Sequence, residues 1–323
     1  MAETKLLIIH HGALGDVVTT FPAIFKLRQS FGCIDALFQG RLGKLAAELK
    51  VVDNCFALEA AAWASLYSVP VAPAVKNILR TYDSIVLFSH SRQLQETINN
   101  LTGNRVHRIP PRPDVDQPIH VLGHVIAQLA DCGLIETGAR DHDVIACPEM
   151  HSDKRSSGYN PAKVCIHPGS GSKKKNWKIA NYLKTARILE ATGMRTEFIL
   201  GPAEHFLAES LQVQSGPKTG IHIVDDLSAL ASLLKTAGGF IGNDSGISHL
   251  AAFLGLATVA VFGPSDPQRW KPAGRAVKAL RPVLECSPCF ETDSTRCAST
   301  ECLDGTTPEA VVEAFYKLVV TKG

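Results

Sequence analysis

The chain has 323 residues, of which 45% are hydrophobic and 20% charged, a globular composition that suits two domains of about 150 residues each. The formal net charge of +2 is not concentrated in either half, which excludes a basic nucleic-acid module. No apolar run reaches the ~18 residues that a bilayer-crossing helix needs. The first residues lack the features of a signal peptide, so we expect a cytoplasmic protein, with peripheral contact at a membrane surface left open.

Short β-rich runs alternate with helical periods through the first half of the chain. Strands are predicted at residues 5–10, 34–38, 55–58 and 84–89. The clearest helix covers 17–30, where Val17, Phe21 and Ile24 belong to an apolar stripe with helical spacing, and another covers 119–131. This alternation predicts βαβ units on a parallel sheet.

A polar stretch at 147–162 carries Pro148, Gly158 and Pro161 and is interpreted as an interdomain linker. The alternation then restarts. The strands predicted beyond it are 163–167, 196–200, 221–224, 239–242 and 258–262, and the helices are 179–192, 203–212, 227–236, 246–254 and 308–320. Two such domains predict a cleft between the carboxyl ends of two sheets, where open α/β sheets bind ligands.

The loop after the first strand reads Gly12-Ala-Leu-Gly15-Asp16 and leads into the first helix. Its glycines allow the backbone to approach a ligand closely. Asp16 is a candidate catalytic carboxylate that accepts a proton from an attacking hydroxyl, and the alternative is a helix N-cap. The loop lacks the third glycine of GxGxxG, which argues against a dinucleotide site.

The loop that opens the second half reads His167-Pro-Gly-Ser-Gly-Ser-Lys-Lys-Lys-Asn-Trp177. Backbone N–H groups, hydroxyls and lysines together suit a diphosphate. The spacing of a Walker A loop is absent, which argues against ATP hydrolysis. The alternative is a solvated lysine run on a surface turn.

A third loop, Gly242-Asn-Asp244-Ser245-Gly246-Ile-Ser248-His249, joins a strand to a helix. Its cap residues would leave N–H groups at the helix start facing an anion, with His249 one turn further on. The alternative is a capped helix with a satisfied histidine. Together the three loops predict two phosphate-binding segments in one domain and a carboxylate in the other.

The motifs, taken in order, carry a resemblance over nearly the whole chain. They are Gly15-Asp16 followed by Pro22, His167-Pro-Gly with Lys175-Asn-Trp177, Asp244-Ser-Gly-Ile-Ser-His249, and Phe262-Gly-Pro-Ser-Asp-Pro267. The sequence resembles glycosyltransferase family 9, the lipopolysaccharide-core heptosyltransferase group. Its tail, from Cys286-Ser-Pro-Cys289 through Glu301-Cys302-Leu to Thr307-Pro-Glu309, is most similar to the heptosyltransferase II branch.

The resemblance implies an α/β fold of the GT-B class, in which two Rossmann-like domains with parallel sheets face each other across a cleft. Residues 1–150 would bind the acceptor and residues 162–323 the nucleotide-sugar donor. The implied reaction is metal-independent, inverting transfer of a heptose from ADP-heptose to a lipopolysaccharide inner-core acceptor. No cofactor would be required beyond the ADP-sugar, the acceptor would be a lipid-linked saccharide at the cytoplasmic face of the inner membrane, and no nucleic acid would bind.

The resemblance also implies roles for single residues. Asp16 would be the general base, and the diphosphate would be held by Ser170, Lys175, Ser245, Gly246 and Ile247. The nucleoside and sugar would contact Glu204, Leu227, Asp244 and His249. An anionic acceptor would suit bidentate contacts, for which the candidates are Arg92, Arg105, Arg108 and Arg112. The alternatives are a different serine of the loop, Ser172, for Ser170, and solvated surface side chains for Glu204 and the arginines.

Two features bear on metal binding. The Asp-x-Asp pairs at 114–116 and 141–143 lie away from the phosphate loops and are interpreted as polar surface. Four cysteines, Cys286, Cys289, Cys297 and Cys302, have a spacing that admits a structural zinc site. The family is not defined by a zinc, so the main expectation is no metal.

Two other functions stay open. One keeps the fold with another nucleotide-sugar donor, because no residue can be assigned to heptose stereochemistry. The other is a non-catalytic nucleotide-sugar binding protein, against which Asp16 argues, since such a protein has no need of this carboxylate. An NAD-dependent oxidoreductase is disfavoured by the missing glycine fingerprint.

Overall fold

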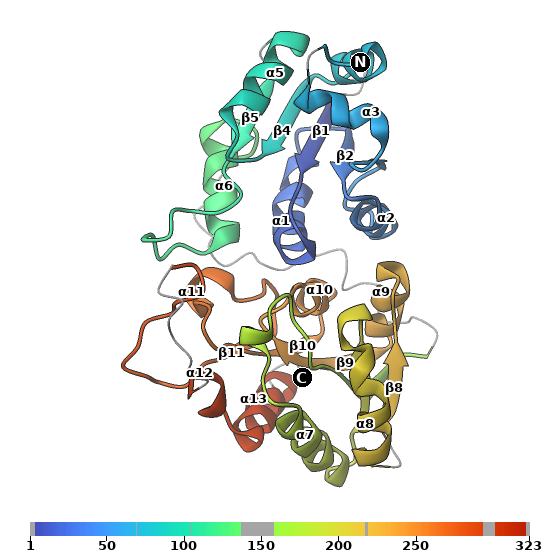
Figure 1. Ribbon diagram of the computed structural model, residues 1–323, viewed down its shortest axis with the longest axis vertical. Coiled ribbons are helices and arrows are strands. Elements are labelled where there is room, and N and C mark those ends of the chain that lie inside the picture. Colours follow the sequence, from blue (N-terminus) through green and yellow to red (C-terminus); the bar gives the residue numbers. More distant parts are fainter. Residues whose placement is uncertain are drawn as a thin grey trace. The chain divides into compact units, whose positions relative to one another are not determined.

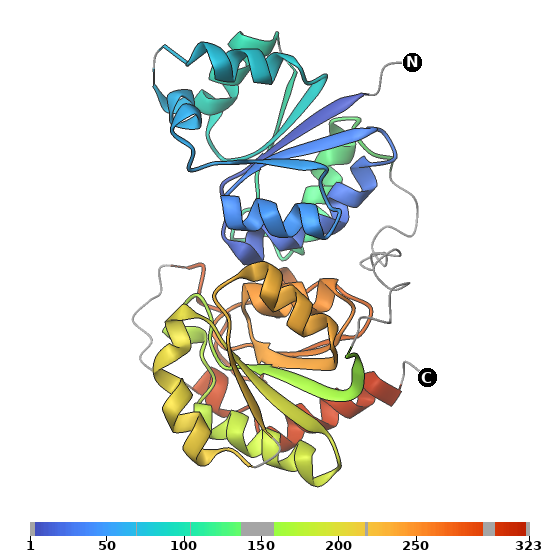
Figure 2. The same cartoon turned by 90° about the vertical axis from the view of Figure 1, so that its right-hand side faces the viewer.

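The computed structural model divides the chain into two compact units, each a parallel sheet with helices on both faces (Figures 1 and 2). The residues described are 4–68, 70–103, 105–136, 158–216, 219–292 and 301–320. The first unit holds the described residues up to 114 together with 121–136. The second unit holds the rest, including the short segment 115–120, whose place in this unit the sequence did not predict.

The first unit is built on five parallel strands in the order β3-β2-β1-β4-β5. The strands are β1 (Lys5–His10), β2 (Cys33–Phe38), β3 (Asn54–Ala57), β4 (Ser84–Phe88) and β5 (Val106–Ile109). The helices are α1 (Leu14–Leu27), α2 (Gly40–Glu48), α3 (Ala61–Ala64), η1 (Ser65–Tyr67), α4 (Pro73–Arg80), α5 (Arg92–Thr102) and α6 (Val121–Asp131). Alternate residues of β1, Leu7 and Ile9, join the core under α3, α4 and α5, because successive strand side chains point to opposite faces.

The second unit has six parallel strands in the order β11-β10-β9-β6-β7-β8. They are β6 (Asn160–His167), β7 (Arg195–Leu200), β8 (Gly220–Ile223), β9 (Ala237–Asn243), β10 (Ala257–Val261) and β11 (Val277–Leu280). The helices are η3 (Lys173–Lys175), α7 (Ile179–Ala191), η4 (Pro202–Leu207), α8 (Ala208–Gln214), α9 (Leu227–Lys235), α10 (Gly246–Phe253), α11 (Pro267–Trp270), α12 (Glu301–Asp304) and α13 (Pro308–Val320). Helices α7, α8 and α13 share one core against one face of this sheet.

Both sheets contain a point where the strand order reverses. In the first unit it lies between β1 and β4, and in the second between β6 and β9. At such a point the connections leave the sheet toward opposite faces, which opens a crevice at the carboxyl ends of the two strands. The loops that follow β1, β6 and β9 are the three loops that the sequence singled out, and because β6 and β9 are neighbours their two loops lie side by side.

The predicted fold class, α/β with two parallel sheets, is confirmed, and several boundaries differ. Helix α1 begins at Leu14 rather than at 17, and the helix predicted at 203–212 is the 3-10 turn η4 followed by α8. Most of the predicted linker at 147–162 lies outside the described residues, and its last residues, 160–162, belong to β6. Among the described residues, no helix has the length and apolar character to cross a bilayer.

Candidate functional site

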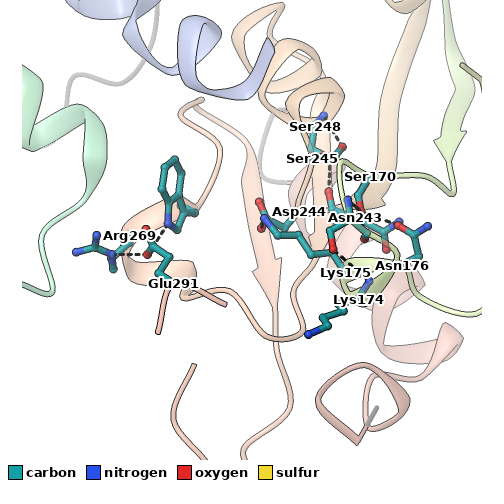
Figure 3. A network of polar contacts seen from close by, with 12 residues as sticks. Ser170, Lys174, Lys175, Asn176, Asn243, Asp244, Ser245, Ser248, Arg269 and Glu291 are labelled. Atoms are coloured by element: carbon teal, nitrogen blue, oxygen red, sulfur yellow. Dashed lines mark hydrogen bonds and ion pairs between the residues drawn. The ribbon is translucent and has the colours of Figure 1, made fainter. Parts of the chain in front are cut away.

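Lys175 and Asp244 meet at the strand-order reversal of the second sheet. Lys175 ends η3, the turn after β6, and its Nζ lies 2.7 Å from Oδ2 of Asp244, which directly follows β9. The Phe290 ring packs under the same ammonium, 3.9 Å from Nζ to the ring centroid. Figure 3 shows Lys175 and Asp244 pointing toward one another beside the loop of Ser170. A positive charge held by an anion and a ring face is thus fixed where α/β sheets bind ligands.

Asn243, the last residue of β9, ties the loop after β6 to the end of β9, a contact that the sequence did not predict. Its Nδ2 donates to the carbonyl oxygens of Pro168 and Gly169 at 2.8 and 3.1 Å. Its Oδ1 accepts from the backbone N–H of Trp177 at 2.9 Å. The side chain is fully buried, so these bonds fix the loop before Lys175 against β9. The signal in the sequence was an amide side chain next to the motif Asp244-Ser245.

The N-terminus of α10 lies beside the ion pair of Lys175 and Asp244. Ser245 caps the helix, and its Oγ accepts from the backbone N–H of Ser248 at 3.4 Å. The Ser248 hydroxyl in turn donates to the Asn243 carbonyl at 2.5 Å. The first-turn N–H groups of Gly246 and Ile247 have no carbonyl within the helix to bind, and the positive end of the helix dipole favours an anion there.

The Ser170 hydroxyl acts within its own loop. Its Oγ donates toward the carbonyl of Ser172 at 2.7 Å and Oδ1 of Asn176 at 2.6 Å, and it accepts from the backbone N–H of Ser172 at 3.2 Å. A hydroxyl whose one proton is shared between two acceptors thus holds the shape of its own loop.

Glu204 lies directly against the loop that follows β6. Its Oε2 accepts from the backbone N–H of Gly201 at 3.2 Å, which places the side chain back over the start of η4. A Cβ added at Gly169 would lie 2.1 Å from Oε1 of Glu204, so only glycine admits the carboxyl at this point. Burial raises the pKa of Glu204. Leu227, predicted near the nucleoside, is half-buried at the start of α9, where Asp226 caps the helix.

Two buried histidines stay neutral in this unit. Burial lowers the pKa of His249 to about 4, with His120 and Lys175 lowering it further and Asp244 opposing them. Burial likewise lowers the pKa of His167 to about 4, although its Nδ1 lies 2.9 Å from the carbonyl of Ile199. Near neutral pH, His249 therefore offers hydrogen-bonding capacity beside Asp244 and Lys175 without adding charge.

The segment 115–120 is fastened to the second unit by a buried arginine that the sequence analysis missed. Arg269 in α11 is 3% exposed and pairs with Glu291, Nε to Oε2 2.8 Å, as Figure 3 shows. The same guanidinium bonds the carbonyl of Gln117, and His120 lies 2.8 Å from the carbonyl of Lys271. These contacts hold the segment next to Glu291, whose neighbour in the chain, Phe290, packs on Lys175.

In the first unit, Asp16 lies in the first turn of α1 rather than at its cap. Ala13 is the N-cap, and its backbone N–H donates to Oδ2 of Asp16 at 3.2 Å. The backbone N–H of Gly12 donates to Nδ1 of His10 at 2.9 Å. A Cβ at Gly12 would lie 2.5 Å from Cε1 of His10 and 2.7 Å from Cβ of Asp16, so the loop is tightly packed between these two side chains.

His10 supports this loop and was missed by the sequence analysis. It is 2% exposed at the end of β1, and its ring lies near those of Phe38 and Phe88, with centroids 6.3 and 5.0 Å away. Burial and the neighbouring His11 lower the pKa of His10 to about 3. The ring is therefore neutral at neutral pH and accepts the Gly12 N–H through the unprotonated Nδ1.

The four candidate arginines do not lie together. Arg108 bonds Oε1 of Gln95 at 3.1 Å and the carbonyl of Ser89 at 3.4 Å, at the carboxyl ends of β4 and β5. Arg92 opens α5 and Arg112 follows β5, so both are at the same end as Asp16. Arg105 precedes β5 and donates to the carbonyl of Tyr82 at 3.0 Å, which places it at the opposite end of the sheet.

The described residues contain no group of three or more His, Cys, Asp or Glu side chains arranged to hold a metal ion. Of the four terminal cysteines, Cys286, Cys289 and Cys302 are free thiols, and Cys297 lies outside the described ranges. The Asp-x-Asp pair at 141–143 lies outside them as well, whereas Asp114 and Asp116 are exposed.

The chain was compared with known proteins. The sequence model of glycosyltransferase family 9 (heptosyltransferase) matches residues 89–298. Lipopolysaccharide heptosyltransferase 1 of Pseudomonas aeruginosa is 33% identical over 69 residues, 21% of this chain and 19% of that protein. Lipooligosaccharide heptosyltransferase 2 of Campylobacter jejuni is 24% identical over 174 residues, 52% of this chain and 53% of that protein. The alignments thus cover about a fifth and about half of these two relatives.

Among solved structures, that of the ADP-heptose lipopolysaccharide heptosyltransferase II of E. coli superposes with a TM-score of 0.71 at 18% identity, over 99% of both chains. This likeness confirms the predicted GT-B class of fold with its two Rossmann-like domains. The family match covers well over half of the chain and includes the loops of Lys175 and Asp244. The chain belongs to glycosyltransferase family 9, the heptosyltransferase family.

Proposed function

We propose that this protein is an inverting glycosyltransferase that transfers a heptose from ADP-heptose to a lipopolysaccharide inner-core acceptor without a metal ion. The observation that carries the proposal is the placement of Lys175, Asp244 and the N-terminus of α10 at the strand-order reversal of the second sheet. Lysine and helix N–H groups together suit a diphosphate. The donor is taken from the heptosyltransferase relatives and from the E. coli protein named for ADP-heptose.

In the proposed reaction, an acceptor hydroxyl oxygen forms a bond to the anomeric carbon while the bond from that carbon to the diphosphate oxygen breaks. The hydroxyl proton passes to the Asp16 carboxylate, and the ADP leaves with the electron pair of the broken bond. Lys175 and the N–H groups of Gly246 and Ile247 offset the charge that develops on the diphosphate. Each preorganised donor of this kind contributes about 3 kcal/mol to lowering such a barrier.

The remaining residues of the donor site receive supporting roles in this proposal. Ser170 shapes the phosphate loop, Glu204 contacts the ribose across Gly169, and Leu227 borders the adenine. His249 contributes as a neutral hydrogen-bonding group next to Asp244. The second unit is thus proposed to bind the donor, and the first unit, with Asp16, to bind the acceptor.

For the acceptor we propose a lipid-linked saccharide, reached at the cytoplasmic face of the inner membrane. Arg92, Arg108 and Arg112 are proposed to bind its anionic groups, since they lie at the same end of the first sheet as Asp16. Arg105 is left out because it lies at the other end. The tail motifs favour the heptosyltransferase II branch, although the matched relatives include both kinds.

A calorimetric panel of ADP-, UDP- and GDP-sugars tests the donor. We expect binding of ADP-heptose and of ADP itself, with UDP- and GDP-sugars at least tenfold weaker. Preferred binding of a UDP- or GDP-sugar would point to the second candidate, the same fold with another donor. Tight binding of ADP-heptose with no transfer to any saccharide acceptor would point to a non-catalytic binding protein.

A further inference from the structure

An exposed tyrosine contacts the loop that joins β1 to the helix of Asp16. Tyr67, the last residue of η1, is 61% exposed, and its hydroxyl is hydrogen-bonded to Nε2 of His11. The rings of the two residues are 6.0 Å apart between centroids, at an interplanar angle of 68°. Burial lowers the pKa of His11 and raises that of Tyr67, so both groups are neutral near pH 7 and the contact is a hydrogen bond, not an ion pair.

The tyrosine is exposed, but its neighbours in the chain are anchored in the core. Trp63 and Leu66, its neighbours in α3 and η1, are 4% and 3% exposed, and the Trp63 ring packs on Phe56 with centroids 5.3 Å apart. The hydroxyl of Ser65 also accepts from the backbone N–H of Ala72 at 3.1 Å. A ring that is anchored by buried neighbours and by its hydroxyl loses less conformational entropy than a free ring when a ligand binds.

Tyr67 is coupled to the proposed base through two adjacent residues. Tyr67 bonds His11, and a Cβ on the next residue, Gly12, would lie 2.7 Å from Cβ of Asp16. Tyr67 follows β3 and Asp16 follows β1, so both lie at the carboxyl edge of the first sheet, along which the proposed acceptor would extend.

The surroundings of the ring restrict what that molecule presents there. Residues 60–75 contain no Asp, Glu, Lys, Arg or His, in a chain that is 20% charged. Most of the alanines of this segment are exposed, so the segment that carries Tyr67 contributes no charged side chain of its own to bind a phosphate or carboxylate. The face of a phenol ring is slightly negative and suits the C–H face of a sugar ring.

We propose that Tyr67, oriented by His11, is a specificity-determining residue that stacks on an uncharged sugar ring of the acceptor. This inference rests on the proposed function, because it assumes that the acceptor hydroxyl meets Asp16. It divides the acceptor between two surfaces of the first unit: the sugar ring on Tyr67 and the anionic groups on the arginines.

The test measures transfer to the saccharide released by deacylation of lipopolysaccharide from cells that lack this protein, with Tyr67→Ala, Tyr67→Phe and, as a control, Tyr159→Ala. Tyr159 is 43% exposed and precedes β6, at the amino end of the second sheet. We expect Tyr67→Ala to raise the acceptor KM roughly threefold to tenfold, the loss of one aromatic stacking contact, with ADP affinity unchanged. Tyr67→Phe keeps the ring but loses the bond to His11, so its acceptor KM should lie between those of the wild type and Tyr67→Ala.

Three results would overturn the inference. An unchanged acceptor KM in Tyr67→Ala would show that the ring makes no contact with the acceptor. An equal rise in KM in Tyr67→Phe would show that the hydroxyl, and not the ring, makes the contact. A defect seen only with the acylated acceptor in vesicles assigns the surface to lipid. Wild-type protein that transfers no sugar contradicts the proposed function itself, whereas transfer by a wild type and a Tyr67→Ala variant with equal KM contradicts only the role of Tyr67.

Discussion

Lys175 has one ammonium group, which Asp244 and the Phe290 ring already hold in place. In the proposed complex a diphosphate adds a second anion to the same group. A charge-assisted hydrogen bond contributes about 1.5–3 kcal/mol, and removing the lysine also leaves the Asp244 carboxylate uncompensated beside the phosphates. We therefore predict that Lys175→Ala weakens ADP binding roughly 10- to 100-fold in calorimetry.

The neighbouring lysine provides the matched control for this change. Lys174 is exposed in the same turn, so Lys174→Ala removes the same charge from the same loop without touching Asp244. It should change ADP affinity by less than about threefold, as a distant, solvent-screened charge does. If both variants lost the same affinity for ADP, the effect would come from the positive charge of the loop in general. The specific role of Lys175 would then be contradicted.

His167 makes a prediction about stability. Its folded pKa of about 4 lies below the ordinary histidine pKa of 6.5, so between these values the unfolded chain binds more protons than the folded one. The stabilisation is complete above about pH 6.5 and is lost as the pH falls toward 4, by on the order of 3 kcal/mol. Denaturant unfolding of His167→Asn, which lacks the titrating ring, should show a shallower decline over this window. An unchanged pH slope would contradict this assignment, since His10 and His249 contribute in the same direction in both proteins.

At the scale of elements, the turn between β1 and α1 is sensitive to substitution because it is tightly packed. A Cβ at Gly12 meets His10 and Asp16 at 2.5 and 2.7 Å, closer than carbon atoms approach one another. Gly12→Ala should displace Asp16 and lower kcat at least tenfold while ADP binding stays unchanged. The control is Gly123→Ala in α6, where a Cβ meets nothing within 4 Å. A Gly12→Ala enzyme with wild-type kcat would show that the placement of Asp16 does not depend on this packing.

The same elements show what the sequence could and could not predict. The central strands were predicted because they are continuous apolar runs buried on both faces. The edge strands β5 and β11 were missed: β5 is only Val106–Ile109, and His107 and Arg108 interrupt its apolar pattern. The start of α1 was placed three residues late, because the apolar stripe begins at Val17 while the first turn depends on the hydrogen bond from Ala13 to Asp16.

Side-chain partners were the part of the site that the sequence left open. The motifs predicted which loops follow strands, but not that Asn243 ties two of them together or that His10 accepts the Gly12 N–H. The first contact depends on which strands are neighbours in the sheet, and the second on the tautomer of a buried histidine. The spacing of residues in the sequence reveals neither. The arginines illustrate the same point. Arg105 and Arg108 are close in the sequence, but the direction of β5 places them at opposite ends of the sheet.

At the scale of the whole molecule, the proposed reaction offsets the leaving charge with Lys175 and helix N–H groups and needs no divalent ion. We predict that a saturating concentration of EDTA leaves the initial rate of heptose transfer within about twofold of the untreated rate, as expected when protein donors alone stabilise the leaving group. The measurement is the rate of ADP release before and after chelation, with Mg²⁺ added back to the same sample. Loss of activity that Mg²⁺ restores would contradict the proposed mechanism.

The central claim is that a carboxylate of the first unit removes the proton while the second unit holds the diphosphate. Asp16→Asn keeps an oxygen that can accept the Ala13 N–H, so the helix start should persist, but the amide cannot take up a proton. The deciding measurement is the rate of heptose transfer by Asp16→Asn together with its affinity for ADP. We predict a fall in kcat of roughly 10²- to 10⁴-fold with ADP affinity within about twofold of the wild type. Turnover at the wild-type rate would contradict the account.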